Sequence, residues 1–483
     1  MNYLRTRARV RLGRRLAAIP LATLLLACPA SGRTAAAAPG PATSAPERRA
    51  GPGGALILVE ANHALPIVHV VVALRSGASW DPHKKEGLAY LAATAARRGA
   101  AGQSRVQLDA HIDALGADLE VVVDPDSTRF EGHVLARYLD EFLGIVADVV
   151  LRPDFPGAEV TRARRDVLAE IDEDSTDDVS LGSRYFGRNL YGDHPCGYPP
   201  EGTRASVARL RREDLRGFFS QHVVGPNVVL AAGGDVSADD FTAAVRRHFA
   251  ALPTRPAPGP NPLALREPQP PRGWRIQIID KPDREQAQIF FGQLAVPATD
   301  PDFVPLMVMA TSFGGHGMKA TMMDEIRTKR SLAYGAYMTL SERLERGALT
   351  GWVQAAAAKA VPTLKLALKL YVALMEKGLE PDRLAFAKSF LAGTVTTEMD
   401  DPEQRLDARV TAEIVGLPPR FVDELPERVQ AVTAAQLGAV MGRRLHAHDL
   451  AITVVATAAK LRPLLIEARI QPSAIDVIPY DDF

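Results

Sequence analysis

The chain has 483 residues, of which 47% are hydrophobic and 24% are charged, and its 57 Lys and Arg residues equal its 57 Asp and Glu residues. This length predicts more than one domain and a large buried core. The balanced charge argues against a nucleic-acid partner and against recruitment to a charged membrane surface.

The first residues differ in composition from the rest of the chain. An arginine-rich segment, Arg5–Arg15, precedes an apolar run from Leu16 to Ala27. A basic segment followed by a short apolar run is typical of a secretory signal, and this run is too short to span a bilayer comfortably. We therefore interpret residues 1–28 as a signal peptide and expect the protein to be exported.

Two forms of processing remain open for this signal. Leu25–Cys28 resembles a bacterial lipobox, in which the cysteine is lipidated after cleavage. The alternative is ordinary cleavage near the alanine run at 35–38. The protein is then either free in the bacterial periplasm or a membrane-anchored lipoprotein, and the lipid on Cys28 would be its only link to a membrane. Residues 29–53, rich in Ala, Pro, Ser and Gly, favour a flexible tether.

Cysteine is scarce in this chain, which has two such residues. If Cys28 is lost or lipidated, Cys196 stands alone. Neither a disulfide within the chain nor a cysteine-based metal site can then form.

The next 200 residues alternate between strand-like and helix-like patterns. Strands are predicted by β-branched runs, and helices by apolar residues that recur every three to four positions. The predicted strands are 55–60, 67–77, 117–124, 128–134 and 227–236. The predicted helices are 85–98, 106–115, 134–150, 156–175, 214–221 and 237–249, the last with Ser237 as its N-cap.

A proline-rich stretch then separates this pattern from a second copy of it. Strands are predicted at 275–280, 286–296, 332–341, 346–354 and 450–456, with helices among them. The shared order of elements indicates a duplicated α+β protein. We divide the chain into a signal (1–28), a tether (29–53), an N-terminal domain (54–255), a linker (256–272), a C-terminal domain (273–470) and a tail (471–483).

Several motifs of the first half occur in a characteristic order. They are "R-S-G-A-S-W-D-P", "E-G-L-A", "R-R-D-V-L-A-E-I" and "Y-G-D-H-P-C-G-Y-P". With them, residues 54–470 resemble the pitrilysin/insulinase-type zinc metallopeptidases, and specifically their short, mitochondrial-processing-peptidase-like branch. The resemblance implies two homologous α/β-layered halves of the mitochondrial-processing-peptidase/LuxS-like metallohydrolase fold, able to close like a clamshell.

The zinc motif of that family is degenerate here. Active members carry H-x-x-E-H just after Gly-Leu-Ala, which puts two histidine ligands on one helix face and a glutamate base beside the bound water. In this chain Tyr90, Ala93 and Thr94 occupy those three positions. Only the distal carboxylate, Glu170, is retained, and one carboxylate does not hold zinc tightly. We expect neither zinc nor another cofactor in this chain, and we expect Glu170 to be a helix-surface or packing residue.

The remaining histidines offer no obvious replacement. No two of the eleven are spaced i,i+3 or i,i+4, as ligands on one helix face require. His83 lies in a charged loop, and His446 and His448 are two residues apart. Solvated or packed side chains are therefore the expectation for all of them.

The second half retains a different part of the family's machinery. Gly314, Gly315 and Gly317 begin a segment that continues to Arg327 and Tyr334. In active relatives an arginine and a tyrosine at this separation hold the substrate backbone, and the glycines resemble the glycine-rich loop of the non-catalytic processing subunit. Without that resemblance, Arg327 is a solvated charge at a helix end, Tyr334 a packed strand residue and the glycines a turn.

The resemblance implies a substrate-binding subunit that is inactive alone. It would form a heterodimer with a zinc-bearing homologue, which would cleave the extended peptide that this chain holds. Three alternatives stay open. They are a homo-oligomeric peptide-binding or chaperone-like protein, a structural homologue like the core subunits of the respiratory cytochrome complex, and an active metallopeptidase with an unorthodox metal site.

Overall fold

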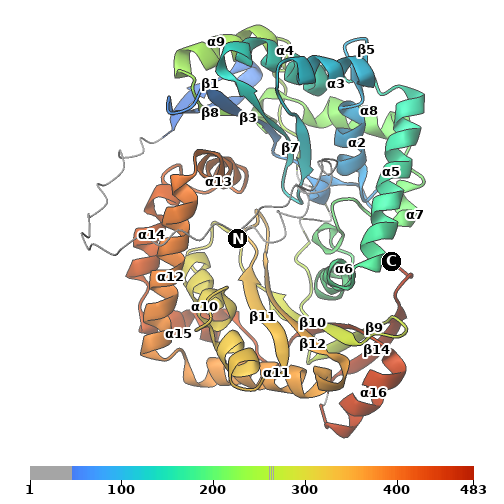
Figure 1. Ribbon diagram of the computed structural model, residues 1–483, viewed down its shortest axis with the longest axis vertical. Helices are drawn as coiled ribbons and strands as arrows, with labels where there is room; N and C mark the ends of the chain where they lie inside the picture. Colours follow the sequence, from blue (N-terminus) through green and yellow to red (C-terminus); the bar gives the residue numbers. More distant parts are fainter. Residues whose placement is uncertain (1–45, 260, 263, 265, 471) are drawn as a thin grey trace, which may run out of the picture. The chain divides into compact units, whose positions relative to one another are not determined.

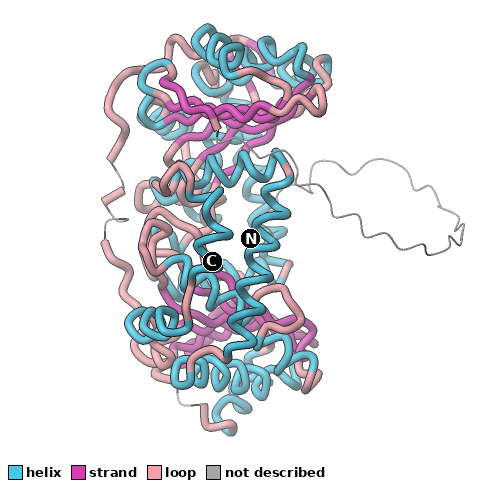
Figure 2. Tube along the Cα trace, turned by 90° about the vertical axis from the view of Figure 1, so that its left-hand side faces the viewer, coloured by secondary structure: helices cyan, strands magenta, loops and turns pink. Residues whose placement is uncertain are grey.

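The computed structural model describes residues 46–259, 261–262, 264, 266–470 and 472–483. The predicted signal, Cys28 and the tether as far as residue 45 lie outside the described residues. Residues 46–483 form one compact unit. Its long strands fall into two six-stranded sheets, drawn in magenta in Figure 2. None of the helices in the described ranges combines the length and apolar character needed to cross a bilayer.

The first sheet and its helices come from residues 47–248. The strand order is β1-β2-β8-β3-β7-β6. Figure 1 labels β1, β8, β3 and β7 of this sheet. The strands are β1 (Glu47–Ala50), β2 (Leu56–Ala61), β3 (Ile67–Leu74), β6 (Glu120–Val123), β7 (Thr128–Leu135) and β8 (Val228–Gly234), with β4 (Gly99–Ala100) and β5 (Gln103–Ser104) as a separate pair. The helices are α2 (Leu88–Ala96), α3 (Arg105–Ala114), α4 (Leu139–Leu151), α5 (Gly157–Thr176), α6 (Asp178–Tyr191), α7 (Arg204–Val207), α8 (Arg212–His222) and α9 (Ala238–His248).

The second sheet has the order β11-β12-β10-β13-β9-β14. Its strands are β9 (Arg275–Asp280), β10 (Gln286–Leu294), β11 (Ala333–Leu340), β12 (Ala348–Ala356), β13 (Ala451–Ala456) and β14 (Ala474–Pro479). Its helices are α10 (Phe303–Gly314), the π-helix Met323–Thr328, α11 (Ala360–Lys377), α12 (Pro381–Asp400), α13 (Pro402–Ile414), α14 (Phe421–Ala431), α15 (Ala434–Arg444) and α16 (Ala458–Glu467).

The two sheets confirm the predicted duplication. Read from β2, the first sheet runs β2-β8-β3-β7-β6, and read from β9, the second runs β9-β13-β10-β12-β11. Each position is filled by the corresponding strand of its half. The predicted Ser237 cap is also present, since the Ser237 side chain accepts a hydrogen bond from the backbone N–H of Asp240.

Three segments differ from the sequence prediction. Val134 and Leu135 end strand β7 instead of beginning a helix, because Val134 is buried on the same face of the strand as Phe130. Residues 47–50, assigned to the tether, form β1 on the edge of β2. Residues 474–479, assigned to the tail, form β14, which pairs in parallel with β9. Backbone hydrogen bonds hold both edge strands. The polar, mostly exposed residues of β1 give no hydropathy signal, whereas β14 also packs Ile475 and Ile478 against the core.

Each half sends one helix onto the sheet of the other half (Figure 1). On α6, Phe186 and Leu190 are buried against Phe290 and Leu294 of the second sheet. On α13, Leu406, Val410 and Ile414 are buried against the first sheet, at Leu58, Val71, Ala73, Val229 and Ala231. Burial of this apolar surface joins the halves.

Candidate functional site

The N-terminus of α2, which carries the degenerate zinc motif, is fixed by a buried carboxylate. Asp81 accepts hydrogen bonds from the backbone N–H groups of Gly87, Leu88 and Ala89, at 2.8, 3.0 and 2.9 Å. These are donors that a helix leaves unsatisfied at its start. Burial raises the pKa of the Asp81 carboxyl, and the three N–H donors oppose that shift. Gly87 has a φ of 91°, so this entrance to the helix favours glycine.

Tyr90 and Glu170 are brought together at the position of the missing zinc ligands. The Tyr90 hydroxyl donates a 2.9 Å hydrogen bond to Oε2 of Glu170, which comes from the middle of α5. Burial and the nearby carboxylate raise the pKa of Tyr90, which keeps its proton in place for this bond. The Tyr90 hydroxyl thus binds the Glu170 carboxylate, which in active members of the resembling family would bind the metal ion.

The other two motif positions offer no ligand. Ala93 is fully buried in the apolar core of the first half, and Thr94 is a half-buried residue one helical turn beyond Tyr90. Nearby, the buried guanidinium of Arg184 on α6 forms ion pairs with Glu201 and, at 3.4 Å, with Asp174. A positive charge therefore already neutralises the acidic groups around this position.

Arg327 and Tyr334 also meet, in the second half of the chain. The Arg327 guanidinium carbon lies 5.5 Å from the centre of the Tyr334 ring, which is typical of a cation–π contact. Tyr334 is 76% exposed, so it is not the packed strand residue of the alternative interpretation. The neighbouring Lys329 and Arg330 form ion pairs with Glu325, whereas Arg327 has none among the described residues.

Both residues of this pair lie where the backbone is irregular. Arg327 belongs to the π-helix Met323–Thr328, a form that is often found at functional sites. Tyr334 is the extra residue of a β-bulge, because Ala333 pairs with Ala355 and Gly335 already pairs with Gln354. A bulge re-aims a side chain, and β11 is an edge strand of its sheet. Tyr334 is therefore presented to solvent at an open edge, with the half-buried Arg327 against its ring.

The three glycines of this region serve close packing. Gly314 is the last residue of α10, and a Cβ there would meet the backbone N of Met338 at 2.3 Å. At Gly315 a Cβ would meet the Thr311 carbonyl oxygen, and at Gly317 the Phe386 ring. The segment is thus a turn between two helices that needs small residues, and it leaves Met318 exposed on the surface.

A row of aromatic rings leads from α6 to the same edge. Successive ring centres are 6.1 Å apart from Phe186 to Phe290, 6.5 Å to Trp352, 5.5 Å to Tyr337 and 5.0 Å to His316. Trp352 and Tyr337 are only half-buried, so this face of β11 and β12 presents aromatic surface. We call these five residues the aromatic row; periodicity alone did not reveal it.

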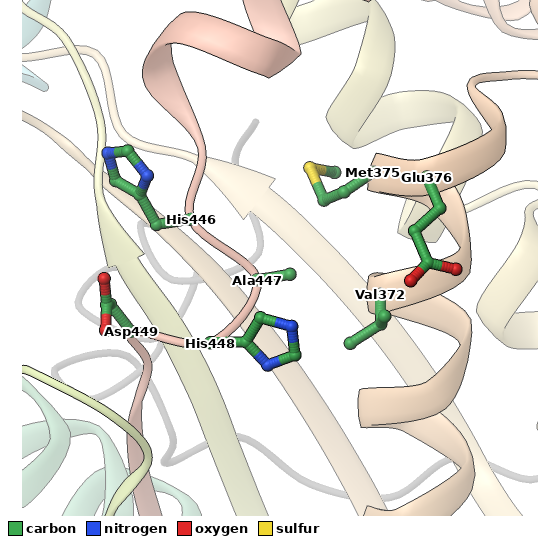
Figure 3. A pocket seen from close by; sticks show the side chains of 7 residues that line it. All are labelled: Val372, Met375, Glu376, His446, Ala447, His448 and Asp449. Carbon is green, nitrogen blue, oxygen red and sulfur yellow. The ribbon is translucent and has the colours of Figure 1, made fainter.

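His446 and His448 line a pocket together with α11. The pocket is formed by Val372, Met375, Glu376 and the loop residues 446–449. Figure 3 shows the two imidazole rings pointing in different directions from the loop. The His448 ring stacks on Trp274 at 6.2 Å, and the backbone N–H of His446 donates to Gln293. These histidines are anchored in the fold, and their rings do not converge.

One histidine cluster is formed by residues that are far apart in the sequence. His69 of β3 and His133 of β7 are partners in the antiparallel ladder, and their rings stack at 4.6 Å. Glu403 of α13 lies beside them, and the three side chains offer ligand atoms within 4.8 Å of one another. Both strands were predicted, but their register was not, and only the register brings residues 69 and 133 together.

Comparisons with known proteins agree with this architecture. Residues 56–203 match the family described as "Insulinase (Peptidase family M16)", and residues 209–391 match its "Peptidase M16 inactive domain". An uncharacterised zinc protease of Mycobacterium tuberculosis is 26% identical over 410 residues, which cover 83% of this chain and 90% of that protein. The "Non-peptidase homolog YmxG" of Helicobacter pylori is 22% identical and covers 84% of this chain and 92% of its own.

A solved structure extends the agreement to three dimensions. The peptidase M16 inactive domain from Pseudomonas fluorescens superimposes with a TM-score of 0.77 and 25% sequence identity. The superposition covers 85% of this chain and 97% of that one, so both halves take part in it.

Proposed function

Because the chain belongs to the insulinase (peptidase M16) family, we propose that it is the non-catalytic, substrate-binding subunit of a heterodimeric zinc metallopeptidase. The partner would be a zinc-bearing homologue. In this chain, Tyr90 and its hydrogen bond to Glu170 replace the ligand set, so no residue at the motif supplies a general base.

The observation that carries this proposal is the half-buried Arg327 beside the exposed Tyr334. The Arg327 guanidinium has no ion-pair partner in the described part of the chain and donates only a long hydrogen bond to Met323 Sδ, so most of its N–H groups are available next to the tyrosine. Arginine presents several N–H groups in a fixed geometry, which suits peptide carbonyl oxygens. The tyrosine O–H adds a donor that steadies a developing oxyanion.

The open edge of the second sheet suits an extended peptide. A peptide strand adds to such an edge through main-chain hydrogen bonds, and neighbouring side chains select its residues. Arg327 and Tyr334 would then contact peptide bound at the partner's zinc, where the metal supplies Lewis-acid activation of carbonyl and water. The aromatic row beside this edge favours peptides with apolar or aromatic side chains.

The proposed complex would assemble outside the cytoplasm. The basic and apolar segments before Cys28 support export, with the protein either free in the bacterial periplasm or anchored there by lipid.

Reconstitution with a zinc-bearing homologue tests the proposed function. The homologue should come from the same organism, with an adjacent reading frame that encodes H-x-x-E-H as the first choice. We expect hydrolysis of a quenched fluorescent peptide to rise when this chain is added. With the double variant Arg327→Ala/Tyr334→Phe, the stimulated rate of hydrolysis should be about 10²–10³-fold lower, because the donors act at the transition state.

Arg330→Ala is the matched control, because it removes an exposed arginine from the same segment that is paired with Glu325. It should retain the stimulation. Absence of any stimulation, or equal stimulation by the double variant, would contradict the proposed function. Peptide binding without stimulation would favour a chaperone-like role instead.

A further inference from the structure

The cluster of His69, His133 and Glu403 lies on the face of the first sheet that α13 covers. His69 shares this face of β3 with Val71 and Ala73, which are buried against α13. Glu403 begins α13, where Asp401 caps the helix by accepting from the N–H groups of residues 403 and 404. Two strands of one half and a helix of the other therefore fix these three side chains relative to one another.

A fourth donor lies next to the three. Asp407 is one helical turn after Glu403, on the same side of α13. Its Oδ1 is 3.3 Å from His69 Nε2, and Glu403 Oε2 is 3.1 Å from His133 Nε2. Each imidazole thus has one carboxylate of α13 against it, which gives two nitrogen and two oxygen donors.

We propose that His69, His133, Glu403 and Asp407 bind a divalent transition-metal ion of the Zn²⁺ class, which pins α13 to the first sheet. The proposal goes beyond the peptide-binding role and does not depend on it. Two imidazoles with carboxylates form a donor set that suits zinc and its neighbours rather than calcium or magnesium. With four protein donors, no coordination position is left for substrate, so the site is structural.

The dimensions allow this with small side-chain movements. Ligands of a tetrahedral ion at ~2.1 Å lie about 3.4 Å apart. The ligand atoms of His69, His133 and Glu403 already lie within 4.8 Å of one another, so shifts below about 1 Å suffice for these three, and Asp407 Oδ1 lies 3.3 Å from His69 Nε2.

The surroundings of the two rings also suit a cation. His69 is 5% exposed, and its Nδ1 has no hydrogen-bond partner among the described residues. His133 also faces carboxylates on both sides, since its Nε2 lies 3.1 Å from Glu403 Oε2 and its Nδ1 lies 3.3 Å from Asp118 Oδ2. These carboxylates would stabilise a metal ion bound at the ring.

The site has a consequence for zinc measurements. Metal that is measured in the unmodified chain would be bound at this cluster rather than at the motif in α2. A chain with His133→Gln is therefore the proper sample for asking whether the Tyr90 position binds zinc.

Titration of the untagged, metal-stripped chain with Co²⁺ tests the proposal, because the visible spectrum of Co²⁺ reports its ligands. We expect saturation at one ion per chain, displacement by Zn²⁺ and a rise in unfolding temperature with either metal. His133→Gln and Glu403→Gln should each weaken binding by about tenfold or more. Glu403→Gln keeps the shape of a half-exposed side chain, so it tests the site even if a histidine variant folds poorly.

His111→Gln is the control, because His111 also pairs with a carboxylate, Glu141 at 2.7 Å, but lies outside the cluster. It should bind metal like the unmodified chain. The proposal is wrong if the unmodified chain shows no saturable binding, or if either His133→Gln or Glu403→Gln binds as tightly as the control.

Discussion

Tyr90 occupies one of the three degenerate positions of the motif and takes part in the packing of α2 on α5. Its hydroxyl donates to Glu170, the carboxylate that the resemblance implies as the family's distal ligand. The Tyr90 hydroxyl supplies a hydrogen-bond donor to this half-buried carboxylate, which stabilises its burial. The sequence identified Tyr90 and Glu170 separately, as a lost ligand and a retained one. Their direct contact could not be predicted, because residues 80 positions apart meet only through the packing of α2 on α5.

Replacing Tyr90 tests this contact. Tyr90→Phe should lower the free energy of unfolding by about 1–2 kcal/mol, because Glu170 loses a donor. Tyr371→Phe is the matched control, since the buried Tyr371 hydroxyl has no hydrogen-bond partner among the described residues and its removal should be neutral or stabilising. Denaturant unfolding measures both variants. Equal losses of unfolding free energy in Tyr90→Phe and Tyr371→Phe would show that the hydrogen bond of the Tyr90 hydroxyl does not stabilise the fold.

The buried His222 should make the free energy of unfolding depend on pH in the acid range. Burial, reinforced by Arg255, lowers the pKa of His222 to about 4, and the ring packs on Phe218. The unfolded chain binds a proton below about pH 6.5 and the folded chain does not, so the stabilisation is present above pH 6.5 and lost as the pH falls toward 4.

Unfolding free energies of the unmodified chain and of His222→Gln between pH 7 and 4 measure this effect. The advantage of the unmodified chain should shrink by up to about 3 kcal/mol across that range. A difference between the two chains that stays constant with pH would contradict the assignment.

At the scale of elements, the hydrophobic pattern was a good guide wherever an element is buried. The strands at 67–77 and 227–236 were predicted from continuous apolar runs, since both are buried on two faces, and the helix at 156–175 from apolar residues that recur every three to four positions. Strands β1 and β14 were missed, since they lie at sheet edges and are held by the backbone. The bulge at Tyr334 and the π-helix at Arg327 were missed too, because backbone irregularities have no hydrophobic signature.

The α13 joint between the halves combines apolar contacts with buried charge. Glu60 of β2 forms ion pairs with Arg405 and Arg409 of α13, and all three side chains are buried. Removing Glu60 leaves the buried Arg405 without its carboxylate, and leaves Arg409 with Asp423 as its remaining partner at 2.9 Å.

Glu60→Gln should therefore destabilise the protein by about 3–5 kcal/mol. Asp239→Asn, which breaks an exposed pair with Arg49, should change stability by no more than about 0.5 kcal/mol. Hydrogen exchange should show increased exchange in α13 for Glu60→Gln only. If α13 stays equally protected in both variants, the ion pairs do not hold the joint.

At the scale of the whole molecule, the exchanged helices explain why two similar halves behave as one unit. The sequence predicted the duplication, but it did not predict that α6 and α13 cross to the opposite sheets. That exchange brings Glu403 and Asp407 to the His69–His133 pair. Spacing rules for metal sites consider one helix or strand at a time. They therefore do not detect a cluster whose residues come from three different elements.

Export predicts a processed N-terminus. Mass spectrometry of the mature protein should find no residue before Cys28, because both forms of processing remove the basic segment. A diacylglyceryl mass on Cys28, lost in Cys28→Ala, would identify the lipoprotein form. Recovery of a chain that begins at Met1 would contradict the assignment of a signal.

The central claim is that this chain holds an extended peptide and does not cut it. The most direct measurement adds a fluorescent apolar peptide to the isolated chain and follows anisotropy for binding and mass spectra for cleavage. We predict saturable binding, weakened at least about tenfold by Arg327→Ala/Tyr334→Phe and kept by Arg330→Ala, with the peptide intact. Chelator-sensitive cleavage by the isolated chain, or binding that ignores the double variant, would contradict the account.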